Sequence, residues 1–154
     1  MNLQSALRVA PLFSTLDDRQ RTRIGDLMTI RNFDAGTTII RQGSSAVALY
    51  LILEGRVEVS REPDDGGRPT PLATLEPGDV FGEMAVLDDE TRSSSVTASE
   101  PTRCALLSRW ELLQELRRHP ELAIELIRVL ARRIRTLNER LAALSATDKT
   151  VGAA

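Results

Sequence analysis

The sequence has few of the residues on which many metalloenzymes and disulfide-stabilised proteins depend. Its 154 residues include one cysteine, Cys104, and one histidine, His119, and only 3% of its side chains are aromatic. A single cysteine excludes an intrachain disulfide and suits a reducing compartment. A single histidine excludes a multi-histidine metal site and, because His119 lies outside the strand-rich region, a Ser-His-Asp triad within that region. We expect no metal, no cofactor and no catalytic residues.

Excess positive charge and long apolar runs are also missing. The formal net charge is -2, so the composition gives no footprint for binding a nucleic acid. No apolar run approaches the roughly 20 residues that a membrane span needs. The first residues, MNLQSALRVAPLF, are too polar for a signal peptide and lack its basic start. We therefore expect a cytoplasmic protein of one domain, without a nucleic-acid or membrane partner.

Residues 1–29 have a helical pattern. Asp17 can cap a helix, with Gln20 three residues later completing a capping box. The apolar residues of this segment fall near one face of the helix: Phe13, Leu16, Ile24, Leu27 and Met28.

Residues 30–108 change to short strands and turns. The runs TTIIRQG and VALYLILEGRVEVSRE are rich in strand-forming residues, and turn signals recur at DAGT, QGSS, LEGR, EPGD and SEPT. About eight closely spaced strands predict an antiparallel β-roll of the jelly-roll type. With the flanking helices, the expected fold class is α+β.

Residues 109–145 are predicted to form a hinge helix and a long C-terminal helix. Ser108 and Glu111 read as a capping box, and His119-Pro120 separates the two helices. The long helix carries one apolar stripe, Leu122, Leu126 and Val129, that suits packing on the roll. A second stripe follows a heptad pattern and predicts a homodimer: Ala123, Ile127, Leu130, Ile134, Leu137, Leu141 and Leu144. Residues 146–154 are expected to form a disordered tail.

The stretch DVFGEMAVLDDETRSSSV, whose residues 80–96 we treat as one binding segment, has the composition of an anion site. Gly82 has no side chain to keep a ligand away from the backbone. Glu83, Met84 and Ala85 can form a single helical turn whose first amides have no partner within the helix and can donate to an anion. Arg92 follows with a planar fork that suits two phosphate oxygens.

Glu83 cannot face a phosphate, so it should accept a hydrogen bond from a neutral donor such as a sugar hydroxyl. The combined target is a phosphate fused to a sugar. The alternative is that Glu83 and Arg92 form a structural ion pair within the roll.

The segment FGEMAVLDDETRSSSV resembles the phosphate-binding cassette of cyclic-nucleotide-binding domains, and FDAGTTIIRQGSSAVALYLILEGRVEV resembles the first half of the same fold. The long helix, with ARRIRTLNERLAAL, is similar to the dimerising helix of the catabolite activator protein branch. The likeness covers roughly residues 7–144. It implies a sensor domain that binds cAMP or, as a second choice, cGMP.

The resemblance also implies roles for individual residues. Arg92 would pair with the cyclic phosphate, together with the amides of Ala85 and Ser93. Glu83 would accept from the ribose 2′-hydroxyl, with support from the Gly82 amide. The long helix would cover the base, and its candidate residues are Arg133, Leu137 and Asn138. The branch named above has hydroxyl side chains at the last two positions, so Leu137 and Asn138 are departures from its pattern.

Three functions follow from these observations as alternatives. The leading one is a sensor that changes the conformation of its C-terminal helices. We expect the sensor to stand alone, since no DNA-binding segment follows the long helix, and its downstream effector is unknown. The second is a dimerisation module on the same fold without a ligand. The third is a cupin-like enzyme, which the single histidine disfavours.

Overall fold

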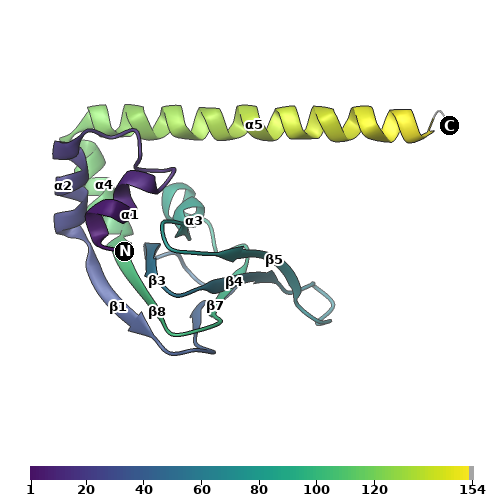
Figure 1. Cartoon of the computed structure of the whole chain (residues 1–154), viewed down its shortest axis with the longest axis horizontal. Coiled ribbons are helices and arrows are strands. Elements are labelled where there is room, and N and C mark those ends of the chain that lie inside the picture. Colours follow the sequence, from purple (N-terminus) through teal and green to yellow (C-terminus); the bar gives the residue numbers. More distant parts are fainter. Residues whose placement is uncertain (153–154) are drawn as a thin grey trace.

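The structure is a computed structural model that describes residues 1–152, with side chains described up to residue 147. In this part of the chain a β-roll follows two N-terminal helices and precedes two C-terminal ones, all four helices lie on the same side of the roll, and the last helix projects far beyond it (Figure 1). The helices are α1 (Leu3–Val9), α2 (Asp18–Leu27), α3 (Glu83–Asp88), α4 (Arg109–Arg118) and α5 (Pro120–Gly152). The strands are β1 (Thr29–Phe33), β2 (Thr38–Ile40), β3 (Ala48–Glu54), β4 (Val57–Arg61), β5 (Thr70–Leu75), β6 (Val80–Phe81), β7 (Ser95–Ala98) and β8 (Thr102–Ser108).

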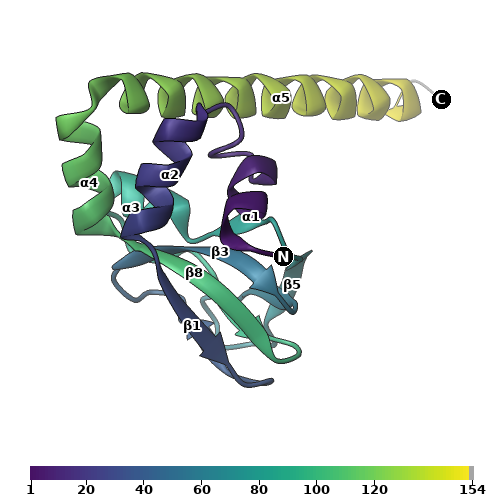
Figure 2. The same cartoon turned by 60° about the vertical axis from the view of Figure 1, so that its left-hand side comes forward.

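The strands form two four-stranded sheets in which the pairs are antiparallel. One sheet has the order β1-β8-β3-β6, and the other has the order β2-β7-β4-β5. Strands β1, β8 and β3 lie side by side beneath the helices (Figure 2). The predicted α+β class and antiparallel roll are confirmed.

Strand β3 is buried on both of its faces, which explains its almost continuous apolar sequence. Leu49 and Leu51 belong to the core between the roll and the helices. Tyr50 and Ile52 point to the opposite face and belong to the core inside the roll. Because successive side chains of a strand point to opposite faces, one strand serves both cores. It therefore connects the interior of the roll to the helical layer.

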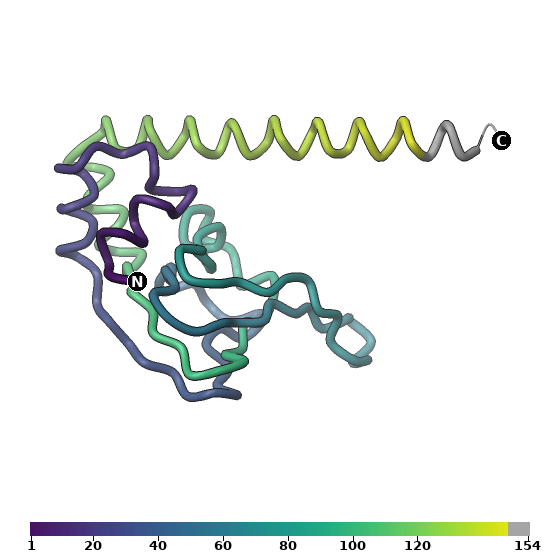
Figure 3. Tube along the Cα trace, viewed as in Figure 1, coloured from purple at the N-terminus to yellow at the C-terminus, as the bar shows by residue number. Residues whose placement is uncertain are grey.

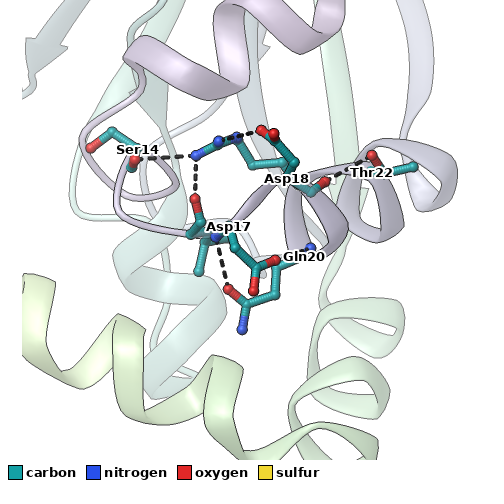
Figure 4. A network of polar contacts seen from close by, with 7 residues as sticks. Ser14, Asp17, Asp18, Gln20 and Thr22 are labelled. Atoms are coloured by element: carbon teal, nitrogen blue, oxygen red, sulfur yellow. Dashed lines mark hydrogen bonds and ion pairs between the residues drawn. The ribbon is translucent and has the colours of Figure 1, made fainter.

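The N-terminal helices are fixed by the predicted capping box. The Gln20 amide donates to Asp17 Oδ1 at 2.8 Å, and the Asp17 amide donates to Gln20 Oε1 at 3.0 Å (Figure 4). The turn before this helix is held by Arg21, which donates to the carbonyl oxygens of Ser14 and Leu16. The prediction of a helix start at Asp17 is confirmed.

The C-terminal helices also begin where the sequence predicted. The Glu111 amide donates to the Ser108 hydroxyl at 3.1 Å, and Pro120 opens α5 directly after His119 ends α4. Leu122, Leu126 and Val129 are buried in the helical core, as the first stripe predicted.

Helix α5 continues further than the sequence predicted. Its end was expected near residue 145, but the helix runs to Gly152 (Figure 1). The Cα trace shows how far α5 projects past the roll (Figure 3). The prediction of a disordered tail is wrong for residues 146–152, and residues 153–154 lie outside the described part. The sequence has no proline or glycine between residues 121 and 151, so it gives no stop signal before Gly152. None of the described helices is both long enough and apolar enough to cross a membrane.

Candidate functional site

The residues predicted for the binding segment meet around one cavity in the roll. The cavity has a volume of about 210 Å³. Its polar side is lined by residues from the predicted set, namely Gly82, Glu83, Met84, Ala85, Arg92 and Ser93. Its apolar side is formed by the roll, through Ile40, Val59, Leu75, Val80, Phe81 and Val96. Ligand pockets usually measure about 300–1,000 Å³, so this cavity is smaller than the usual range.

Gly82 places the backbone of α3 at the cavity. It precedes the helix with φ +78°, in the left-handed region that glycine tolerates best. A Cβ atom at this position would lie 2.8 Å from Arg92 Nη1 and 2.9 Å from Ile40 Cδ1. Glycine is therefore required at this position for two reasons, its left-handed backbone conformation and the close approach of the Arg92 side chain.

Arg92 is a buried cation with main-chain partners. The residue is only 5% exposed, and it lies in the segment between α3 and β7. Its Nη1 donates to the Gly82 carbonyl and its Nη2 to the Ala48 carbonyl, both at 2.5 Å. Burial lowers the pKa of the Arg92 guanidinium, while Tyr50 and Glu83 act in the opposite direction. Within the described residues no carboxylate forms an ion pair with Arg92, and several of its five N–H groups stay available to a ligand.

The backbone of Arg92 is also fixed by the neighbouring loop. The Arg92 amide donates to the Ser44 carbonyl at 2.8 Å, and the Arg92 carbonyl accepts from the Gly43 amide at 2.8 Å. The amide of Gln42 donates to the hydroxyl of the buried Ser95 at 2.9 Å. These contacts fix the main chain at Arg92, and the Gly82 and Ala48 carbonyl groups fix its guanidinium.

Glu83 does not form the alternative ion pair with Arg92. Its Oε1 instead accepts from Nη1 of Arg133 at 3.0 Å. The Glu83 side chain is 13% exposed and that of Arg133 is 34% exposed, so the pair is partly shielded from water. The contact joins the binding segment to helix α5 across 50 residues of sequence.

The predicted base-covering residues divide into two groups. Arg133 reaches the binding segment through Glu83, whereas Leu137 and Asn138 are exposed and do not line the cavity. Leu137 instead lines a separate groove with Arg133, between α5 and the turn after α1. Among the residues of α5 whose side chains are described, only Arg133 therefore reaches the site within one chain.

Sequence reasoning missed Ala48 and Tyr50. Ala48 contributes only its carbonyl oxygen to Arg92, so its side chain carries no signal. Tyr50 stacks on Phe81 with ring centroids 4.9 Å apart and lies near Arg92. As the one tyrosine of the chain it could have been singled out, but its place depends on long-range strand pairing. In the described residues no cluster of three histidine, cysteine, aspartate or glutamate side chains could hold a metal ion.

The sequence around this site is similar to that of known proteins. The cyclic nucleotide-binding domain family matches residues 30–119. A cyclic AMP receptor protein from Thermus thermophilus is 37% identical over 139 residues, which are 90% of this chain and 64% of that protein. A CRP-like cAMP-activated global transcriptional regulator from Mycobacterium tuberculosis is 37% identical over 117 residues, which are 76% of this chain and 52% of that protein. The chain thus spans less than two thirds of the length of these curated relatives.

A solved structure extends the likeness to the fold. The N-terminal domain of a transcriptional regulator from Streptomyces coelicolor A3(2) aligns with a TM-score of 0.79 and 33% identity. The alignment covers 87% of this chain and 95% of that one. The family match includes Gly82, Glu83 and Arg92, the residues that meet at the cavity. On these grounds the chain belongs to the cyclic nucleotide-binding domain family.

Proposed function

We propose that the protein is a regulatory sensor that binds a cyclic mononucleotide, with cAMP as the ligand and cGMP as the alternative. The observation that carries the proposal is the buried guanidinium of Arg92, which faces a cavity and lacks a carboxylate partner among the described residues. A buried cation without an anionic partner is costly, and a phosphate would supply the missing negative charge. The preference for cAMP rests on similarity to proteins named for cAMP.

In this proposal the cavity holds the cyclic phosphate and the ribose. The free N–H groups of Arg92 donate to the phosphate oxygens, together with the amides of Ala85 and Ser93. Met84 contributes through its backbone, since its side chain is 68% exposed. The second oxygen of Glu83 accepts from the ribose 2′-hydroxyl, because Oε1 is engaged by Arg133. The base then extends from the small cavity toward α5.

The ion pair between Glu83 and Arg133 is the route by which we expect the ligand to act on α5. A ligand shifts a conformational equilibrium only if it binds the two states with different affinity. A ribose hydroxyl on Glu83 favours the arrangement in which the carboxylate is already oriented by Arg133. Binding would therefore stabilise the contact between α5 and the binding segment, and the base would add further contacts to the helix.

We propose that a homodimer through α5 completes the site. Ile134 and Leu137 occupy an a and a d position of the heptad, so Arg133 is a g position and Asn138 an e position. In a parallel two-stranded coiled coil, g residues face e residues of the other helix. Asn138 of the partner subunit would then approach Arg133 and the base, which explains why Asn138 does not reach the cavity within one chain.

The alternative is a dimerisation module without a ligand. It is favoured by one observation, the exposure of apolar side chains along α5, since Ile134 is 60% and Leu141 62% exposed. An enzymatic function has less support, because His119 lies at the junction of α4 and α5 and does not line the cavity. We propose a non-catalytic module, and a cytoplasmic location in keeping with its single, buried thiol.

Calorimetric titration of the protein with cAMP and with cGMP tests the proposal. We expect saturable binding of cAMP with one site per chain, and weaker binding of cGMP. Absence of heat and of any thermal stabilisation by either nucleotide would favour the dimerisation module. 5′-AMP is the matched control ligand, since it carries the same base and sugar without the cyclic phosphate.

A further inference from the structure

A second hollow surface lies on the outside of the molecule, where the end of α3 meets α4. It is a groove of about 530 Å³ whose apolar part includes Val47, Trp110 and Leu113. Its polar rim includes Asp89, Arg109 and Arg117. We call these six residues the Trp110 surface. It shares no lining residue with the nucleotide cavity, so it is a separate site.

The apolar side chains of the Trp110 surface are unusually open to water. Val47 and Trp110 are each 68% exposed, and Trp110 is the one tryptophan of the chain. A single exposed apolar residue needs no explanation, but a cluster of them in a hollow is typical of an interaction site. Tryptophan and arginine are also the residues most enriched among those that dominate binding energy at protein interfaces.

The charge of the Trp110 surface indicates what kind of partner it fits. Arg109 is held in place, because its Nε donates to the Val86 carbonyl at 3.2 Å and lies 3.5 Å from Asp89 Oδ1. Asp89 is thereby neutralised. Arg117 is exposed and has no ion-pair partner among the described residues. Arg109 and Asp89 balance each other, so Arg117 gives these six residues a net charge of +1 on a chain whose net charge is -2, and the surface complements carboxylates.

We propose that the Trp110 surface docks an acidic amphipathic helix of a partner protein, with an apolar anchor against Trp110 and carboxylates near Arg117. This is the helix-in-groove mode of recognition, in which anchors repeat at helical spacing. The groove lies between two elements of the proposed sensor. Its Asp89 side follows α3, which carries Glu83, and its Trp110 side belongs to α4, which leads into α5.

The position of the groove gives the partner access to the state of the sensor, a consequence that rests on the proposed function. A partner helix bound there contacts both the binding segment, at Asp89, and α4, at Trp110. If the ligand moves one relative to the other, the affinity for the partner changes by the same factor as the affinity for the ligand. Docking itself requires no nucleotide.

The test uses the full chain without nucleotide and a designed peptide as the probe. The peptide is a helix of about 18 residues, or about five turns, with leucines on one face, glutamates beside them and no tryptophan. Its control replaces every glutamate by lysine. Binding is followed by the emission of Trp110, and confirmed by calorimetry. We expect the acidic peptide to bind at least ~10-fold more tightly than the basic one, a difference of about 1.4 kcal/mol.

Variants locate the binding. Trp110→Ala and Arg117→Glu should each weaken the acidic peptide at least ~10-fold by calorimetry. Arg135→Glu, an exposed arginine of α5 outside the surface, should leave its affinity unchanged. Equal affinity for the two peptides, no saturation by the acidic one, or normal binding to Trp110→Ala would overturn the proposal. So would a change of oligomeric state in Trp110→Ala on sizing columns, since a second copy would then occupy the groove. Nucleotide titration of the same protein is independent of each of these results.

Discussion

Nη1 of Arg133 lies 3.0 Å from Oε1 of Glu83, and the two side chains form an ion pair that is partly shielded from water. Among the described residues this is the only ion pair between the binding segment and α5. The binding segment was predicted to use Glu83 for the ligand, and α5 was predicted to use Arg133 to cover it. The structure connects the two residues before any ligand is considered. The carboxylate is thereby oriented, and the ion pair connects α5 to the binding segment.

The first prediction tests this connection by substitution. Glu83→Gln should weaken cAMP binding by ~10- to 100-fold, because a hydrogen bond to a charged group contributes about 1.5–3 kcal/mol. Arg133→Gln should weaken it less, since it removes only the group that orients Glu83. Calorimetry of both variants and of the double variant gives their coupling, which we expect to exceed ~0.5 kcal/mol. Additive effects would show that Arg133 acts independently of Glu83.

The second prediction concerns Arg92. Arg92→Ala should weaken binding of cAMP at least ~10- to 100-fold, as expected for the loss of a charge-assisted bond to phosphate. It should also lower the free energy of unfolding, because the carbonyl groups of Gly82 and Ala48 lose their donor. Each buried acceptor left without a partner costs about 1–3 kcal/mol.

Binding and stability must therefore be measured separately for Arg92→Ala. Calorimetry below the unfolding transition gives the affinity, and urea denaturation gives the stability. Arg92→Lys is the control that keeps the charge but not the planar fork. Unchanged affinity in a folded Arg92→Ala variant would remove Arg92 as the phosphate ligand.

The sequence predicted the local features of the site well because their causes are local. Asp17 with Gln20, Ser108 with Glu111, and Gly82 before a short helix each act over a few residues. The structure has the first and third as expected, and at Ser108 it has the hydroxyl cap on the Glu111 amide but not the reciprocal bond of a capping box. The partners of Arg92 could not be predicted in this way. Its contact with the Ala48 carbonyl spans 44 residues, and it depends on how the strands pair. The same holds for Glu83, whose partner lies on a helix that the heptad pattern had assigned to dimerisation.

The third prediction compares two glycines with nearly the same φ angle. Gly82 has φ +78° and Gly66 has φ +76°, so alanine is strained to a similar degree at both positions, by about 1–2 kcal/mol. At Gly66 a Cβ atom would meet nothing within 4 Å, whereas at Gly82 it would press on Arg92 and Ile40. Gly66→Ala should cost only the backbone strain and bind cAMP normally. Gly82→Ala should lose more stability and most of its affinity in urea denaturation and calorimetry.

The fourth prediction concerns the buried thiol. Burial raises the pKa of Cys104 from 9.0 to about 12. A folded-state pKa above the unfolded one means that the contribution to stability is complete below pH 9 and is lost as the pH rises toward 12. At pH 8 a thiol reagent should modify the native protein only as fast as it unfolds. Rapid modification of the folded protein would show that Cys104 is accessible and ionisable.

The fifth prediction tests the dimer that we propose as the completed site. Ile134 and Leu141 occupy a positions of the heptad, and each is at least 60% exposed in the single chain. Replacing both by glutamate buries charge in the seam of a coiled coil, so the variant should sediment as a monomer where the unmodified protein sediments as a dimer. Arg135→Glu is the matched control, because it adds the same two units of negative charge at a b position, which faces away from the partner helix. If the monomeric variant binds cAMP as tightly as the dimer, Asn138 of the partner subunit contributes nothing to the base. If the unmodified protein is itself a monomer at high concentration, the apolar stripe of α5 serves some other contact, and the proposed role of the partner subunit is wrong.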